Sequence, residues 1–287
     1  MGSIISPAAD PEDASPSGRS ALVLGTFGFG EALHAREAEV DAICCALDCG
    51  INAFDTAPMY ADGEAERILG LALSGTARDR VSVITKINPW DANLEKMARE
   101  CEASLARMSL DYIDLYLLHW RGPVPIDETV EALERLRGQG KIRDWGVSNF
   151  DREDLLEILA LRRPSLGSLT NQVLYNPRRR EAESRLMNGR FPSLELMAYS
   201  PFERDRPLDL SVFAPVARRH GCDVHAAVLA WILRQGVRPV FKASRRAHVR
   251  ENARAIEVDF LTEELEAIER AYPRLEQPAR IERDDTV

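Results

Sequence analysis

The sequence lacks a disulfide framework, a metal-binding motif, a long apolar run and an excess of basic residues. Its five cysteines are odd in number, and three of them crowd positions 44, 45 and 49 without Cys/His ligand spacing. No apolar run reaches the roughly 18–20 residues of a membrane span. The net charge of −9 argues against a nucleic-acid binder. These absences predict a cytoplasmic protein that holds no metal, crosses no membrane and binds no nucleic acid.

What is present is a regular alternation of strand-like and helix-like segments. Residues 1–19, rich in Pro, Ser, Asp and Ala, predict a loose arm, and residues 20–287 predict one domain. In that domain, apolar runs alternate with segments whose apolar residues recur every three or four positions. Eight such pairs predict a single (β/α)8 barrel. The expected strands are 22–25, 51–54, 81–86, 112–118, 142–147, 168–173, 194–199 and 238–241.

The later part of the chain predicts additions to this barrel. Segments near 211–220 and 223–235 both have helical patterns before the eighth expected strand. Thr262 is expected to cap a further helix, with two glutamates in its first turn. Beyond Pro273 the chain is polar and charged, and we expect it to form a flap over the mouth of the barrel.

Four chemically distinct side chains stand at or just beyond the ends of expected strands: Asp55, Tyr60, Lys86 and His119. In a barrel of parallel strands the C-terminal ends meet at one mouth, where such enzymes place their chemistry. Taken singly, each residue has an ordinary explanation, such as a turn cap or a solvated strand end. Together, a carboxylate, a phenol, an ammonium and an imidazole at one mouth form a proton-donor apparatus. They indicate an enzyme.

With these residues at these spacings, the chain resembles the aldo-keto reductases, from about Leu22 to Leu275. The family's catalytic tetrad matches Asp55, Tyr60, Lys86 and His119. Further matching segments follow in order: 146–150, 171–173, 198–201 and 251–252. The segments 54–60 and 66–70 are similar to bacterial-type members that act on sugars and small carbonyl compounds. The resemblance implies an oxidoreductase that reduces an aldehyde or a ketone to an alcohol.

The chemistry of that reaction assigns a role to each member of the tetrad. Reduction of a carbonyl requires a hydride on carbon and a proton on oxygen, so a general acid must lie beside the substrate. Tyr60 is the expected acid; its ordinary pKa of about 10 falls if a cation stabilises the phenolate. Lys86 supplies that charge, and Asp55 holds the ammonium in place. By resemblance, His119 orients the carbonyl oxygen through a hydrogen bond.

The resemblance also implies a nicotinamide cofactor bound across the barrel mouth. Ser148, Asn149 and Gln172 are expected to hydrogen-bond its carboxamide, while Tyr199, followed by Ser200, stacks on the ring. The residues Ser148 and Asn149 also suit a helix cap after the fifth strand, and both roles can hold together. The glycines near residue 28 have the wrong spacing for the G-x-G-x-x-G fingerprint, and none is expected in this family.

The adenosine end departs from the family pattern. Ala243 occupies the usual serine position and His248 the usual arginine position, so two customary 2′-phosphate contacts are missing. Nearby arginines can replace them, because a guanidinium suits a phosphate. NADPH is therefore favoured, with NADH as the alternative. The other contacts expected in this segment are Lys242, Ser244, Arg245, Glu251 and Asn252.

Aromatic and apolar residues after several strands are expected to bound the substrate, a small carbonyl compound. A regulatory nucleotide-binding subunit, similar to the barrel subunits of potassium channels, is the alternative from another class. A lyase that uses Lys86 as a Schiff-base amine is disfavoured, because Asp55 would keep that amine charged. By the habit of the family, the chain is expected to be a monomer. The expected substrate contacts are Phe27, Met59, Trp90 and Trp120.

Overall fold

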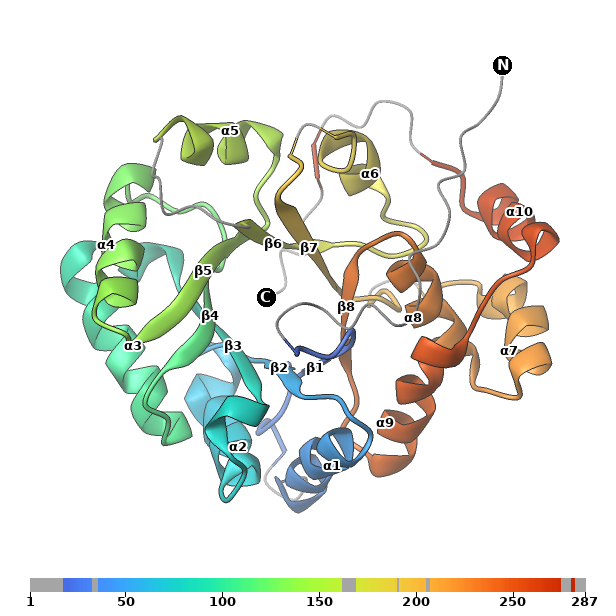
Figure 1. The fold of residues 1–287 in the computed structure, drawn as a ribbon, viewed down its shortest axis with the longest axis horizontal. Coiled ribbons are helices and arrows are strands. Elements are labelled where there is room, and N and C mark those ends of the chain that lie inside the picture. The colour runs from blue at the N-terminus through green and yellow to red at the C-terminus, as the bar shows by residue number, and fades with distance from the viewer. Residues whose placement is uncertain are drawn as a thin grey trace.

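The structure, a computed structural model, is a closed barrel of eight parallel strands that pair in sequence order (Figure 1). It describes residues 18–32, 36–161, 169–189, 191–204, 207–274 and 280–281. All eight expected strands are confirmed, with ends shifted by at most two residues. The strands are β1 (Val23–Gly25), β2 (Ala53–Asp55), β3 (Ser82–Ile87), β4 (Ile113–Leu118), β5 (Ile142–Ser148), β6 (Leu169–Leu174), β7 (Leu194–Tyr199) and β8 (Arg238–Lys242).

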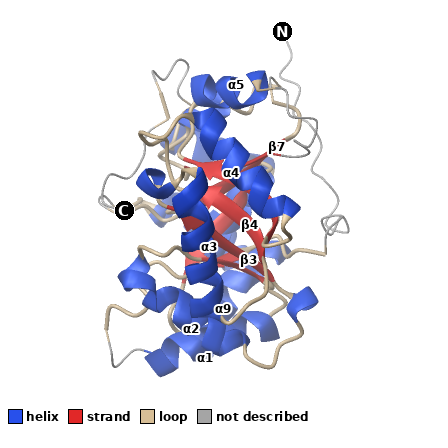
Figure 2. Cartoon of the chain, turned by 90° about the vertical axis from the view of Figure 1, so that its left-hand side faces the viewer, coloured by secondary structure: helices blue, strands red, loops and turns tan. Residues whose placement is uncertain are grey.

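Helices surround the barrel on its outside (Figures 1 and 2). Those that follow the first six strands are α1 (Arg36–Asp48), α2 (Glu64–Leu73), α3 (Leu94–Met108), α4 (Ile126–Gly138), α5 (Arg152–Ala160) and α6 (Glu181–Arg185). The two helices expected between the seventh and eighth strands are confirmed as α7 (Ala214–His220) and α8 (Val224–Arg234). After β8 come α9 (Arg246–Ala253) and α10 (Thr262–Ala271).

Two sequence-based expectations fall mostly outside the described residues. The arm at 1–19 is described only at positions 18 and 19, and the flap beyond Pro273 only at 274 and 280–281. The helix expected near Thr262 is α10. The prediction that Thr262 caps this helix is wrong, because Thr262 is its first residue and the cap is Leu261, whose backbone N–H donates to a carboxylate oxygen of Glu264 at 2.8 Å.

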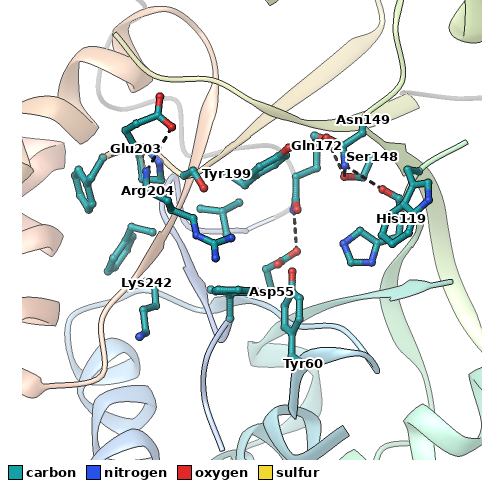
Figure 3. Close-up of a pocket in the computed structure, with 18 residues that line it drawn as sticks. Asp55, Tyr60, His119, Ser148, Asn149, Gln172, Tyr199, Glu203, Arg204 and Lys242 are labelled. Atoms are coloured by element: carbon teal, nitrogen blue, oxygen red, sulfur yellow. Dashed lines mark hydrogen bonds between the residues drawn. The ribbon is translucent and has the colours of Figure 1, made fainter. Parts of the chain in front are cut away.

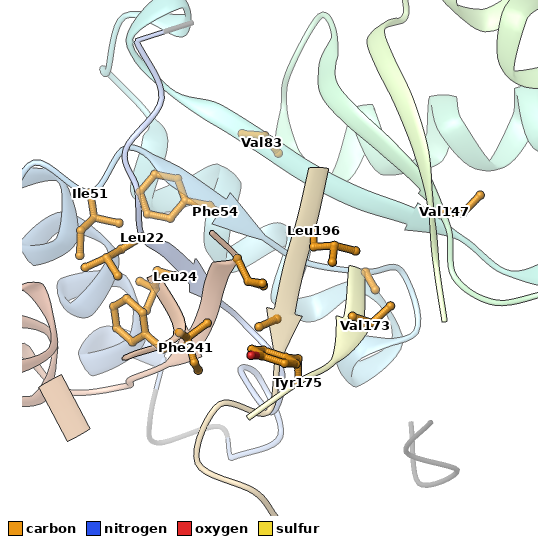
Figure 4. Packing of buried hydrophobic residues seen from close by; sticks show 14 of the residues in the cluster. Leu22, Leu24, Ile51, Phe54, Val83, Val147, Val173, Tyr175, Leu196 and Phe241 are labelled. Carbon is orange, nitrogen blue, oxygen red and sulfur yellow. The ribbon is translucent and has the colours of Figure 1, made fainter. Parts of the chain in front are cut away.

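Alternate residues of the strands face opposite sides of the barrel wall, because side chains alternate along a strand. One set, which includes Leu24, Phe54, Val83 and Phe241, packs with the surrounding helices in a single large buried cluster (Figure 4). Full burial of one such side chain contributes roughly 1.5–3 kcal/mol. The other set forms a separate cluster inside the barrel: Val23, Ala53, Ile84, Leu115, Leu117, Met197 and Val240.

The interior cluster acts as a floor for the mouth of the barrel. Two residues after Val23, Ala53, Ile84 and Met197, the same strands place Gly25, Asp55, Lys86 and Tyr199. Since successive inward positions are two residues apart, these residues form the next layer towards the C-terminal ends. The apolar floor therefore lies directly beneath a layer that carries charge and hydrogen-bonding groups. This register positions the site described next.

Candidate active site

A cavity of about 480 Å³ opens at the C-terminal ends of the strands (Figure 3). This volume lies within the usual range for small-molecule sites. Seven of the eight strands, all except β3, contribute residues at or near their C-terminal ends. Eighteen residues line the cavity: Gly25, Phe27, Asp55, Tyr60, His119, Trp120, Ser148, Asn149, Gln172, Tyr199, Ser200, Pro201, Phe202, Glu203, Arg204, Val240, Phe241 and Lys242.

The structure brings the four tetrad residues together at this cavity: Asp55, Tyr60 and His119 line it, and Lys86 is buried beside them. Lys86, fully buried, donates from Nζ to Asp55 Oδ1 at 2.7 Å, to the carbonyl oxygen of Thr56 at 3.0 Å and to the hydroxyl of Tyr60 at 3.2 Å. The ammonium therefore donates hydrogen bonds to three acceptors, and one of these acceptors is the phenol oxygen of Tyr60. The ring of His119 lies edge-on to that of Tyr60, with centroids 6.2 Å apart.

Electrostatics keep the phenol protonated and the amine charged. Burial raises the pKa of Tyr60 above its ordinary value, and the Lys86 ammonium opposes only part of that rise. Burial alone would lower the pKa of Lys86, but Asp55 and Tyr60 outweigh it, so that the pKa is raised. A charged lysine is a poor Schiff-base nucleophile, which argues against the lyase hypothesis.

His119 is held as a neutral imidazole. Burial, reinforced by the nearby Lys86 ammonium, holds the pKa of His119 well below its ordinary value. Its Nδ1 atom is buried and has no hydrogen-bond partner among the described residues. A neutral ring can donate one hydrogen bond without adding a charge beside Lys86. That suits a group that orients a carbonyl oxygen.

The residues expected to meet the nicotinamide form a connected network at the same cavity. Gln172 donates to Asp55 Oδ2 at 2.8 Å, and Ser148 Oγ donates to the backbone oxygen of Gln172 at 2.8 Å. Asn149 lies in the left-handed backbone region, which asparagine tolerates better than most residues (φ 60°). Its side chain donates to the backbone oxygen of His119 at 3.1 Å and accepts from the Tyr199 hydroxyl at 2.7 Å. The ends of β4–β7 are thereby tied to one another.

The expected substrate contacts divide into two groups. Phe27 and Trp120 line the cavity, and their rings lie 5.2 Å from Tyr60 and 4.7 Å from His119, respectively. Met59 and Trp90, the other two expected contacts, are not among the residues that line this cavity. Trp90 is 49% exposed and packs edge-on against Trp120 instead, with centroids 5.8 Å apart.

The segment expected to meet the adenosine end begins at the cavity and continues away from it. Lys242 and Ser200 line the cavity. Ser244 is half-buried, Asn252 is buried, and Arg245, His248 and Glu251 are exposed on or just before α9. None of these five lines the cavity itself.

Seven residues that line the cavity were not among the site residues expected from the sequence: Gly25, Pro201, Phe202, Glu203, Arg204, Val240 and Phe241. Arg204, in the loop after β7, lines the cavity, and its guanidinium lies 4.3 Å from the centre of the Phe27 ring. Its position in the loop after the seventh strand was visible in the sequence, but nothing there indicated that it reaches across to β1. Arg204 and Lys242 thus place two cationic groups at the cavity, although the net charge of the chain is −9. Cations at the rim suit the phosphates of a dinucleotide.

The donor set also fits the nicotinamide end of such a cofactor. Hydroxyl and amide groups of Ser148, Asn149 and Gln172 line the same cavity as the tetrad. Among the described residues, no group of three His, Cys, Asp or Glu side chains could hold a metal ion. No helix in the described part is long and apolar enough to span a membrane. Fold and site together define a barrel enzyme of the oxidoreductase class.

Comparison with known proteins identifies the family. The model of the Aldo/keto reductase family matches residues 21–273. A methylglyoxal reductase of Escherichia coli, YeaE, is 41% identical over 87% of this chain and 89% of its own length. A glyoxal reductase of Bacillus subtilis is 33% identical over 85% of this chain and 87% of its own. The chain belongs to the aldo/keto reductase family.

A solved structure gives the same result. An aldo/keto reductase of Klebsiella pneumoniae, crystallised with NADP and acetate, is 42% identical, and the TM-score is 0.85. The match covers 92% of this chain and 95% of the Klebsiella chain. The resemblance seen in the sequence, the barrel fold and the reductase class are thereby confirmed.

Proposed function

We propose that this protein is an NADPH-dependent reductase of small carbonyl compounds, with 2-oxoaldehydes as its substrate class. The observation that carries the proposal is the buried Tyr60 hydroxyl, 3.2 Å from Lys86 Nζ, at the wall of a cavity of about 480 Å³. The two relatives named for methylglyoxal and glyoxal reduction support the substrate class. The Klebsiella structure with NADP supports the cofactor.

The residues of this chain have separate tasks in the reaction. A bound NADPH supplies the hydride. His119, neutral and buried, donates a hydrogen bond that places the carbonyl oxygen beside Tyr60. Tyr60 transfers its proton to that oxygen, and the ammonium of Lys86 stabilises the phenolate that results. Asp55 holds Lys86 in position and is itself held by Gln172.

The rest of the cavity orients and encloses the reactants. Ser148, Asn149 and Gln172 hold the carboxamide, and Tyr199 flanks the ring; Arg204 and Lys242 face the phosphates. The rings of Phe27 and Trp120 exclude water from the reacting carbonyl. Ser200, Ser244, Arg245, His248, Glu251 and Asn252 complete the proposed cofactor contacts. A cytoplasmic monomer, as predicted from the sequence, is part of this proposal.

The alternative of a regulatory subunit with little turnover is not favoured, because both relatives carry the names of reductases. Steady-state oxidation of NADPH in the presence of methylglyoxal or glyoxal tests the proposed activity. We expect turnover of at least about 1 per second, the lower end of typical enzyme rates. Tight NADPH binding with no turnover on any aldehyde or ketone of a small panel would favour the subunit instead.

A substitution in α9 tests the cofactor preference. His248→Arg should raise the selectivity for NADPH over NADH by roughly 10-fold, because a charge-assisted hydrogen bond contributes about 1.5–3 kcal/mol. The measurement is the ratio of the two dissociation constants, from quenching of tryptophan fluorescence. His220→Arg is the matched control, since His220 lies at the end of α7, where it pairs with Asp259, and not on α9. An unchanged ratio in the His248 variant would show that Arg245 or another group already meets the 2′-phosphate.

A further inference from the structure

Two loops at the mouth approach one another more closely than any side chain would allow. One follows β3 and contains a short 3₁₀ turn (Pro89–Asp91); the other follows β4 and contains Gly122. A methyl group on Gly122 would lie 2.4 Å from Cβ of Pro89 and 2.7 Å from its carbonyl oxygen. Gly122 is not among the residues with positive φ, so backbone conformation does not require glycine there. The close approach to Pro89 is what requires glycine at position 122.

This contact connects the two tryptophans of the mouth. Pro89 immediately precedes Trp90, and Gly122 stands two residues after Trp120. Trp90 packs edge-on against Trp120 at 5.8 Å, and Trp120 packs against His119 at 4.7 Å. Pro89 is buried and Gly122 is partly buried, so packed surroundings leave the two loops little room to separate. The position of Trp90 therefore depends on how closely the two loops can meet.

Within the turn, the backbone N–H of Asp91 donates to the backbone oxygen of Asn88 at 3.0 Å, but the side-chain contacts that hold the turn to its surroundings are weak. Lys96 donates to the backbone oxygen of Trp90 at 3.4 Å and pairs with Asp91 at 3.3 Å. The side chain of Lys96 is 44% exposed, and exposed pairs of this kind contribute about 0–1 kcal/mol. Trp90 itself is 49% exposed, so burial alone does not hold its ring against Trp120. The contact between Gly122 and Pro89 is a buried constraint between this turn and the loop after β4.

We propose that Gly122 is a positioning residue for the substrate end of the site. Its contact with Pro89 holds Trp90 against Trp120, and Trp90 in turn sets the ring orientation of Trp120, which lines the cavity beside His119. Trp90 acts through Trp120 and does not line the cavity. The proposal rests on the proposed carbonyl reductase activity for its kinetic consequence, but its structural core does not depend on that activity.

The substitution Gly122→Ala tests the proposal. An added methyl group forces the two loops apart, since interiors tolerate such overlap poorly. We expect KM for the carbonyl substrate to rise by roughly 10-fold, the scale of a small misfit in an apolar pocket. We expect kcat and the NADPH dissociation constant to stay within about twofold, because only substrate contacts change. Two indole rings packed this closely give an exciton couplet in the circular dichroism spectrum. We expect this couplet to be lost in Gly122→Ala, whether or not the variant is active.

Two matched alanine substitutions separate positioning from general crowding. Gly138→Ala, at the end of α4, would place a methyl group in open space and should leave KM and the couplet unchanged. Gly70→Ala would place one 2.4 Å from the backbone oxygen of Met108, between α2 and α3. It should lower stability while the couplet and KM persist in the folded fraction.

If Gly122→Ala does not fold, the substitution Trp90→Ala tests the same proposal. Trp90→Ala removes a half-exposed ring without forcing the loops apart, and it should raise KM by a similar factor. In the double variant the two effects should not add, because both act through Trp120. A wild-type KM in Trp90→Ala, or an intact couplet in Gly122→Ala, would overturn the proposal. Loss of the couplet in an enzyme that reduces no carbonyl would instead contradict the proposed function and leave the positioning intact.

Discussion

Tyr60→Phe is expected to lower turnover of the carbonyl substrate by about 100-fold or more, because it removes the general acid. The phenol, whose pKa is raised by burial, accepts a hydrogen bond from the buried ammonium at 3.2 Å. The ring remains, so its edge contact with Phe27 at 5.2 Å and the cavity shape are kept. The measurement is kcat for NADPH-dependent reduction, together with the NADPH dissociation constant.

The cofactor constant serves as the control for this variant. Lys86 retains its bonds to Asp55 and Thr56, so the wall of the cavity should stay in place and NADPH should bind as in the wild type. Turnover close to the wild-type rate would show that another group, such as His119, delivers the proton. A parallel loss of NADPH binding would show a structural defect and not the loss of an acid.

Lys86→Met is expected to lose activity and also to destabilise the fold by about 3–5 kcal/mol. The substitution leaves the carboxylate of Asp55, only 3% exposed, with Gln172 as its remaining side-chain donor. A buried charge without its partner is far more costly than the intact pair, whose atoms lie 2.7 Å apart. The free energy of unfolding, from urea denaturation followed by circular dichroism, measures this loss.

The double variant Asp55→Asn/Lys86→Met separates the loss of stability from the loss of activity. Removal of both charges should restore most of the stability, because no uncompensated charge remains, while activity stays lost. Equal instability of the single and double variants would show that packing of the Lys86 chain, and not its charge, supports the fold. Recovery of activity in the double variant would contradict the role given to the ammonium.

The tetrad could be predicted from the sequence because each member follows a local pattern. Lys86 ends an apolar run and His119 ends another, and parallel strands bring such ends to one mouth. Their exact partners could not be predicted. The bond from Gln172 to Asp55 joins residues 117 positions apart, and only closure of the barrel brings β2 and β6 to opposite sides of one cavity.

The direction in which the pKa of Tyr60 is shifted could not be predicted from the sequence either. A lysine beside a phenol predicts an easier proton release, and that lowering effect is present. Burial is larger, however, so the pKa of Tyr60 is raised overall. The burial of Tyr60 depends on tertiary contacts such as the edge-on packing of Phe27 against its ring, which no local pattern encodes. Trp90 is a second example: it was expected in the cavity wall, but it packs against Trp120 and does not line the cavity.

By itself, the sequence determined the eight strands, the helices between them and the kind of chemistry at the strand ends, because periodicity and strand termini are local properties. The tertiary structure alone decided which groups meet. It placed Arg204 over Phe27 across the mouth and set Gly122 against Pro89. Such contacts depend on the distance between loops that are remote in sequence, and that distance is fixed only when the barrel closes and its core packs.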